Sequence, residues 1–132
     1  MNLITDDMLK FDVTVYENLE PVNNLLSKSR VRIFYKYFNR NRTYITDDFA
    51  NQLIISLPYV PIKGIFDKDD MDFTDHGEKR TEGKIYGIVP ENPNVAWEEH
   101  LDEDGVTRLY CCADVLLFTG IYPEAKLIVG KP

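Results

Sequence analysis

The stretch NVAWEEHLDEDGVTRLYCCADVLLF, residues 94–118, decides the fold class of this chain. At its centre, Asp102-Glu103-Asp104-Gly105 is a turn with an Asp-Gly signal between two runs with strand character, which is typical of a β-hairpin. Residues 94–101 alternate in hydrophobicity, and residues 106–118 form a long return strand. The predicted inward-facing residues of the return strand are Leu109, Cys111, Ala113 and Val115.

Outside this hairpin, four more segments have the composition of strands and two are typical of short helices. The strands are expected at residues 10–16, 31–38, 61–66 and 84–89, and the helices at 47–57 and 122–129. This order predicts an α+β, β-rich fold, a partial β-barrel of six or seven mainly antiparallel strands with two short helices. We interpret residues 1–132 as a single domain, with 1–30 as an amino-terminal strand and linker and 31–132 as an incomplete core.

The net charge of the chain limits the kinds of partner that it is expected to bind. The net charge is −7 and the pI is near 4.8. A protein that binds nucleic acid by neutralising phosphates needs the opposite sign, so direct nucleic-acid binding is disfavoured. No apolar run is long enough to span a bilayer and no signal peptide is visible, so we expect no membrane partner and a reducing cytosol.

A histidine beside carboxylates is the main candidate for acid–base chemistry. His76 lies in the sequence Asp75-His76-Gly77-Glu78, where neighbouring carboxylates favour a general base. The competing interpretation is an exposed loop histidine. His100, which follows two glutamates beside the hairpin turn, is expected to be a surface residue.

An acidic loop is expected at residues 67–83. Its spacing does not fit a calcium-binding loop, so we interpret it as a solvated segment and a candidate partner-binding loop. Two histidines and two cysteines are not at zinc-ligand spacing, so neither a metal nor a cofactor is predicted. The acidic residues of this candidate partner-binding loop are Asp67, Asp69, Asp70, Asp72 and Asp75.

The nucleophiles are few. Cys111 and Cys112 are adjacent in a strand, which favours the role of small core residues over that of a catalytic thiol. Serines occur only at positions 27, 29 and 56, all before His76. Any mechanism that needs a serine on a later strand therefore lacks its nucleophile in this chain.

The order of segments from Val31 onward resembles the amino-terminal portion of bacteriophage prohead (capsid maturation) proteases and related head-morphogenesis proteins. The segments that carry the resemblance are VRIFYKYFNRN, TDDFANQLIISL, PIKGIF, DHG followed by KIYGIVPENPNVAWEE, and RLYCCADVLLFTGIYPEAKLIV. Their order and spacing carry the match, over about three-quarters of the chain.

This resemblance implies an assemblin-like barrel in which His76 corresponds to the catalytic histidine. It also implies a catalytic serine on a strand that would follow Val129, so the chain as it stands is expected to be non-catalytic. Without later strands, residues 84–89 and 106–118 are expected to expose sheet edges that a partner covers. The implied partners are phage capsid or scaffold proteins, or a second copy of the chain, in the cytoplasm of an infected bacterial host or within the prohead or virion.

Two alternatives stay open. The first is an acidic phage-encoded protein that binds and inhibits a basic host factor, such as a nuclease of a defence system. The second is a stand-alone enzyme that uses one of the cysteines, which requires an exposed thiol of low pKa.

Overall fold

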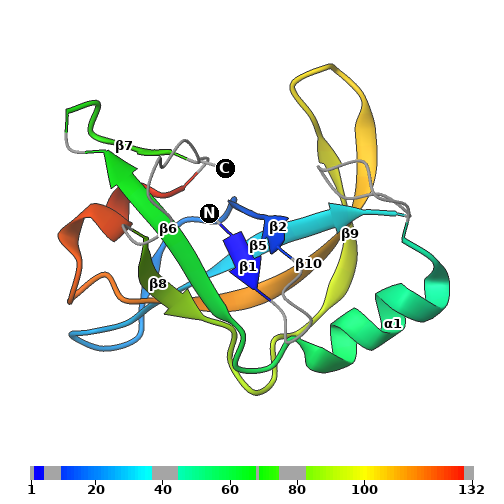
Figure 1. The fold of residues 1–132 in the computed structure, drawn as a ribbon, viewed down its shortest axis with the longest axis horizontal. Helices are drawn as coiled ribbons and strands as arrows, with labels where there is room; N and C mark the ends of the chain where they lie inside the picture. The colour runs from blue at the N-terminus through cyan, green and yellow to red at the C-terminus, as the bar shows by residue number, and fades with distance from the viewer. Residues whose placement is uncertain (1, 5–9, 37–44, 68, 75–82, 130–132) are drawn as a thin grey trace.

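The computed structural model describes residues 2–4, 10–36, 45–67, 69–74 and 83–129 (Figure 1). Strands dominate, and the two helical segments are short. The strands are β1 (Asn2–Ile4), β2 (Lys10–Asp12), β3 (Thr14–Val15), β4 (Glu20–Pro21), β5 (Ser27–Tyr35), β6 (Pro61–Asp67), β7 (Asp72–Thr74), β8 (Lys84–Ile88), β9 (Ala96–Leu101) and β10 (Thr107–Leu117), and the helices are α1 (Asp47–Ser56) and the 3-10 helix η1 (Pro123–Leu127).

Seven strands follow one another in the order β2-β1-β6-β8-β10-β5-β3, and all of the pairings are antiparallel. Three others join from the side: β4 pairs with β5, β7 with β6 and β9 with β10. The α+β, β-rich class predicted from the sequence is confirmed. The first and last strands of the order, β2 and β3, are separated only by Val13. One stretch of chain therefore contacts β1 at one end and β5 at the other, which curls the sheet like a barrel.

The pairing of β5 with β10 sets the two faces of the sheet. A β-bulge shifts the register, so that Cys111 lies opposite Phe34 and Cys112 opposite Arg32. Ile33 is the extra residue of β5, and both Ile33 and Phe34 are therefore buried. The strand predicted at residues 31–38 is present, over its described residues, as part of β5, and its alternation of buried and outward side chains breaks at this bulge.

The core lies on one face of β5 and β10 and is completed by neighbouring elements. Because side chains alternate across a strand, Cys111, Ala113 and Val115 point inward, as the sequence predicted, and are fully buried. Leu53 of α1 and Ala125 of η1 are buried in the same cluster. The amino-terminal stretch adds Val13 and Val15, which are also fully buried.

The helix α1 begins where the sequence predicted. Its N-cap, Thr46, has an extended backbone, and its hydroxyl accepts a hydrogen bond from the Phe49 amide at 3.2 Å. Asp47 and Asp48 lie in the first turn, where the helix dipole favours negative charge. The second expected helix is present as the 3-10 segment η1, with Pro123 in its first turn.

Three expectations need correction. The edges expected at residues 84–89 and 106–118 are covered, because β8 pairs with β6 and β10, and β10 pairs with β5, β8 and β9. The expected linker contains β4 and the start of β5 at Ser27. The acidic loop begins as a hairpin, because β6 and β7 pair with Asp67 opposite Asp72.

One glycine is required by close strand packing. A β-carbon at Gly87 would collide with the Leu116 carbonyl and lie 2.8 Å from Leu117 Cδ2. Gly87 therefore allows β8 to approach β10. Within the described residues, no helix has the length and hydrophobicity needed to cross a membrane.

Candidate functional site

Polar and ionisable side chains gather on the outer face of the β5–β10–β9 sheet, opposite the core. The register places Arg32 across from Cys112 and Arg30 across from Asp114 on one side of β10. On the other side, Glu98 lies across from Tyr110 and His100 from Arg108. Directly opposed residues share a face of the sheet, so these side chains form one surface, here called the polar face. Its members are Tyr16, Lys28, Arg30, Arg32, Asn94, Glu98, His100, Asp102, Arg108, Tyr110, Cys112 and Asp114.

Arg30 is the centre of one hydrogen-bond network on the polar face. Its guanidinium contacts Asp114 Oδ1 at 2.8 Å and Glu98 Oε2 at 2.6 Å. Its Nε donates to the Tyr16 hydroxyl at 3.0 Å. Asn94 Nδ2 donates to the second oxygen of Asp114 at 2.6 Å. The Asp114 side chain is only 6% exposed, so it depends on these partners for the hydrogen bonds that water would otherwise supply.

The protonation of this network is settled by its hydrogen bonds. Burial acts to lower the pKa of Arg30, but hydrogen bonds to Asp114, Glu98 and Tyr16 outweigh it and hold the pKa above its usual value. Burial raises the pKa of Tyr16, so its hydroxyl stays protonated as a donor to Glu98. Arg30 therefore stays charged and the Tyr16 hydroxyl stays neutral at neutral pH.

Asp102 organises a second cluster nearer the hairpin turn. It accepts a hydrogen bond from Arg108 at 2.6 Å and one from the Tyr110 hydroxyl at 2.8 Å. Arg32 Nη1 lies 3.3 Å from the same carboxylate, and its guanidinium stacks 5.0 Å above the Tyr110 ring. These contacts fix the base of the hairpin against β5.

Three potential metal ligands meet between the two clusters. Glu98, His100 and Cys112 each direct one donor atom into a region where the donor atoms lie within 4.8 Å of one another. Cys112 Sγ is 3.6 Å from His100 Nε2. The Tyr16 ring packs edge-on against the His100 ring at 4.4 Å between centroids. We call Glu98, His100 and Cys112 the ligand triad.

The triad does not have the electrostatics of a thiol nucleophile. Burial raises the pKa of Cys112 to about 11 and that of Cys111 to about 12. Activated thiols need a lowered pKa and exposure, and both of these side chains are buried. Burial also lowers the pKa of His100, with the nearby Arg32 charge in the same direction. The prediction that the cysteines are buried strand residues is confirmed.

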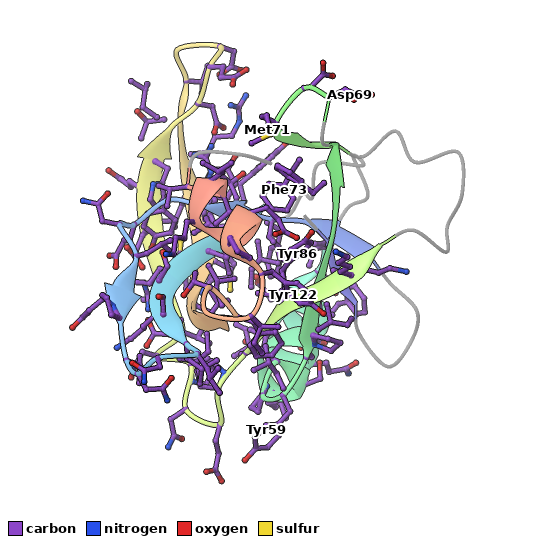
Figure 2. The ribbon with its side chains drawn as sticks, turned by 90° about the vertical axis from the view of Figure 1, so that its left-hand side faces the viewer. Tyr59, Asp69, Met71, Phe73, Tyr86 and Tyr122 are labelled. Carbon is purple, nitrogen blue, oxygen red and sulfur yellow. The ribbon has the colours of Figure 1, made fainter. Side chains whose placement is uncertain are left out.

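The site residues predicted from the sequence are only partly described. His76 and Asp75 lie outside the described residues. Asp69 and Asp70 are exposed in the turn between β6 and β7. Figure 2 shows Asp69 near Met71 at the tip of this hairpin.

A row of aromatic rings supports the β6–β7 hairpin. Phe66, Phe73, Tyr86 and Tyr122 follow one another edge-to-face, with ring centroids 5.1 to 5.3 Å apart. Figure 2 shows the last three in a column below the hairpin tip. Because Phe73 and Tyr86 are buried, the row is a packing feature.

The ligand triad was not among the sites predicted from the sequence. His100 was expected at the surface, but it is half-buried between Tyr16 and Tyr110. The triad depends on the register of the hairpin, which the Asp-Gly turn signal in the sequence did not fix. A turn at 103–105 pairs His100 with Arg108 and Ala96 with Cys112, which places residues 98, 100 and 112 on one face.

Comparison with known proteins gives one family. The chain has no match among curated proteins and none among solved structures. The family model described as the YonD N-terminal domain matches residues 25–131, which is most of the chain and includes β5, β9, β10 and the ligand triad. The chain belongs to the family of the YonD N-terminal domain.

Proposed function

We propose that this chain is a non-catalytic protein-binding domain in tailed-phage head assembly, and that it binds a basic, extended segment of a capsid or scaffold protein along β9. The observation that carries the proposal is the edge of β9. Among the described residues, β9 pairs with β10 alone, so its other edge is open to strand addition.

The backbone groups that would bind the partner follow from the hairpin register. The Asp102 amide donates to the Val106 carbonyl at 3.0 Å, and Leu101 is paired with Thr107 in the same register. Hydrogen-bonded and non-hydrogen-bonded pairs alternate in an antiparallel ladder. Trp97, Glu99 and Leu101 therefore direct their N–H and C=O groups away from β10, toward an incoming strand.

Side chains of the hairpin supply apolar surface at the same place. Trp97 is 39% exposed and Leu101 is 69% exposed. Trp97 and Leu101 are four residues apart on one strand and so lie on the same face. Figure 1 shows the β9–β10 hairpin (yellow to orange) extending beyond the rest of the sheet.

Charge selects the chemistry of the partner. The hairpin from Ala96 to Arg108 has five carboxylates and one arginine, and the whole chain has a net charge of −7. A second copy of the chain would bring Glu98 and Glu99 against the same residues of its neighbour, which is unfavourable. An extended segment that alternates apolar and basic residues could pair with the β9 backbone, cover its apolar side chains and neutralise its carboxylates.

The assignment to phage head assembly rests on the resemblance of residues 31–129 to prohead proteases. In that role the domain works in the cytoplasm of the infected host or within the prohead or virion. An acidic inhibitor of a basic host factor would use the same edge, and the experiment below separates the two.

The test uses Trp97, the only tryptophan in the chain, as the reporter. The protein is titrated with the purified capsid protein and, separately, the scaffold protein of the phage that encodes it, and tryptophan fluorescence is followed at two salt concentrations. If those two proteins lack tryptophan, the signal is direct; otherwise calorimetry replaces it. We expect saturable binding that weakens as salt rises.

The matched variants are Glu99→Pro and Glu99→Thr. Both remove one carboxylate, but only proline removes the outward N–H, without breaking the β9–β10 ladder. We expect Glu99→Pro to weaken binding about tenfold relative to Glu99→Thr, the effect of about one lost hydrogen bond. Equal affinities of Glu99→Pro and Glu99→Thr would refute binding along the β9 edge. Binding to neither phage protein would refute the head-assembly role.

A further inference from the structure

The ligand triad has the donor types of a transition-metal site. A thiolate, an imidazole and a carboxylate are the three ligand types that zinc takes in proteins. Each comes from a different residue of one hairpin, with Glu98 and His100 on β9 and Cys112 on β10. The adjacent Cys111 points to the core and is not part of the cluster.

The distance between two of the donors fits a shared tetrahedral ion. Zinc–sulfur and zinc–nitrogen bonds of about 2.3 and 2.1 Å at a tetrahedral angle place the two ligand atoms about 3.6 Å apart. The separation between Cys112 Sγ and His100 Nε2 is 3.6 Å. The two strands therefore already hold these atoms at the spacing that one ion requires.

The third ligand needs only a small movement. The donor atoms of the triad lie within 4.8 Å of one another, and the Glu98 side chain is 34% exposed, so its carboxylate has room to turn. Glu98 Oε2 is held by Arg30 at 2.6 Å, which leaves Oε1 to bind the ion in place of its 3.1 Å contact with the Tyr16 hydroxyl. Such an outer contact orients a metal ligand.

The local charge also permits a dication. The two arginines beside the triad are each paired with a carboxylate that is not a ligand, Arg30 with Asp114 at 2.8 Å and Arg32 with Asp102 at 3.3 Å. One thiolate and one carboxylate then balance the charge of the ion. The exposed side of Glu98 provides the route of entry, and with three protein ligands a water would complete the tetrahedral set.

We propose that Glu98, His100 and Cys112 bind one zinc ion on the polar face of the β9–β10 hairpin. Binding displaces the thiol proton of Cys112 to solvent, with no change in oxidation state. The ion bridges the two strands of the hairpin whose free edge the proposed function uses. This site is independent of that function, since it needs no partner protein.

The test is a titration of the purified chain with zinc, in competition with a chromophoric chelator, and with cobalt as a spectroscopic substitute. We expect one equivalent to bind and the cobalt form to show a near-ultraviolet thiolate charge-transfer band. Cys112→Ser and His100→Gln should each weaken zinc binding more than about 100-fold, beyond the usual effect of an outer-shell change. Cys111→Ala is the matched control and should keep both the affinity and the band.

A second measurement guards against misfolded variants. Zinc should raise the thermal unfolding midpoint of the wild-type chain and protect Cys112 from alkylation, and a chelator should reverse both effects. Circular dichroism of each variant verifies its fold. Zinc binding unchanged in Cys112→Ser, or a cobalt spectrum without the thiolate band, would overturn the proposal.

Discussion

Arg30 is the single residue on which the polar face most depends. Its side chain is 13% exposed and that of Asp114 is 6% exposed, so this ion pair is shielded from water. Removing one member of a buried pair leaves an uncompensated charge. We expect Arg30→Leu to lower the free energy of unfolding by about 3 kcal/mol, measured by urea denaturation.

Two further variants separate the buried charge from the loss of packing. Lys28 lies 3.6 Å from Asp114 and its side chain is 45% exposed, so Lys28→Met should cost less than about 1 kcal/mol. In the double variant Arg30→Leu/Asp114→Leu both charges are gone, and we expect it to regain at least half of the lost stability. If the double variant is no more stable than Arg30→Leu, the stability lost in Arg30→Leu does not come from the unpaired charge of Asp114.

At the scale of single elements, the N-cap of α1 allows the contribution of one local sequence signal to stability to be measured. Thr46→Ala removes the hydroxyl that accepts from the Phe49 amide, and we expect it to cost about 1 kcal/mol in thermal or urea unfolding. Thr46→Ser keeps the acceptor and should stay within about 0.5 kcal/mol of the wild type. If alanine and serine are equally costly, the loss comes from the threonine methyl group and not from the cap.

The contrast between α1 and β5 shows which elements are predictable from sequence. Thr46, the two aspartates and Pro58 are local signals, and the helix begins and ends where they indicate. In β5 the alternation is interrupted at Ile33, because the bulge depends on how β10 is paired beside it. Nothing within residues 31–38 specifies that partner.

The candidate site was less predictable for the same reason. The adjacent cysteines were expected to be small buried residues of a strand, and both are buried. That His100 and Glu98 lie beside Cys112 depends on the cross-strand register, which sequence spacing alone does not reveal. The prediction for His76 stays a prediction, because residue 76 lies outside the described residues.

At the scale of the whole molecule, the fold depends on residues that precede the matched family segment. Val13 and Val15 are fully buried, β1 pairs with β6, and β3 pairs with β5. A shortened chain of residues 25–132 would expose the core these strands cover. We expect it to lose cooperative urea unfolding, monitored by far-ultraviolet circular dichroism.

A milder change tests the same dependence without removing strands. Val13→Ala/Val15→Ala deletes four buried methyl groups and should lower the unfolding free energy by roughly 3 to 4 kcal/mol. Val22→Ala is the exposed control and should have little effect, since Val22 is 55% exposed. Cooperative unfolding of residues 25–132 at an unchanged midpoint would contradict the role given to the amino-terminal strands.

The position of β10 at the centre of the sheet has a consequence for how the protein is made. Synthesis adds about 5 to 20 residues per second from the amino terminus, and β10, which pairs with β5, β8 and β9, leaves the ribosome after every other described strand. Until it emerges, β5 lacks its longest neighbour and Arg30 lacks Asp114. The sheet can therefore be completed only after residues 107–117 have left the ribosome.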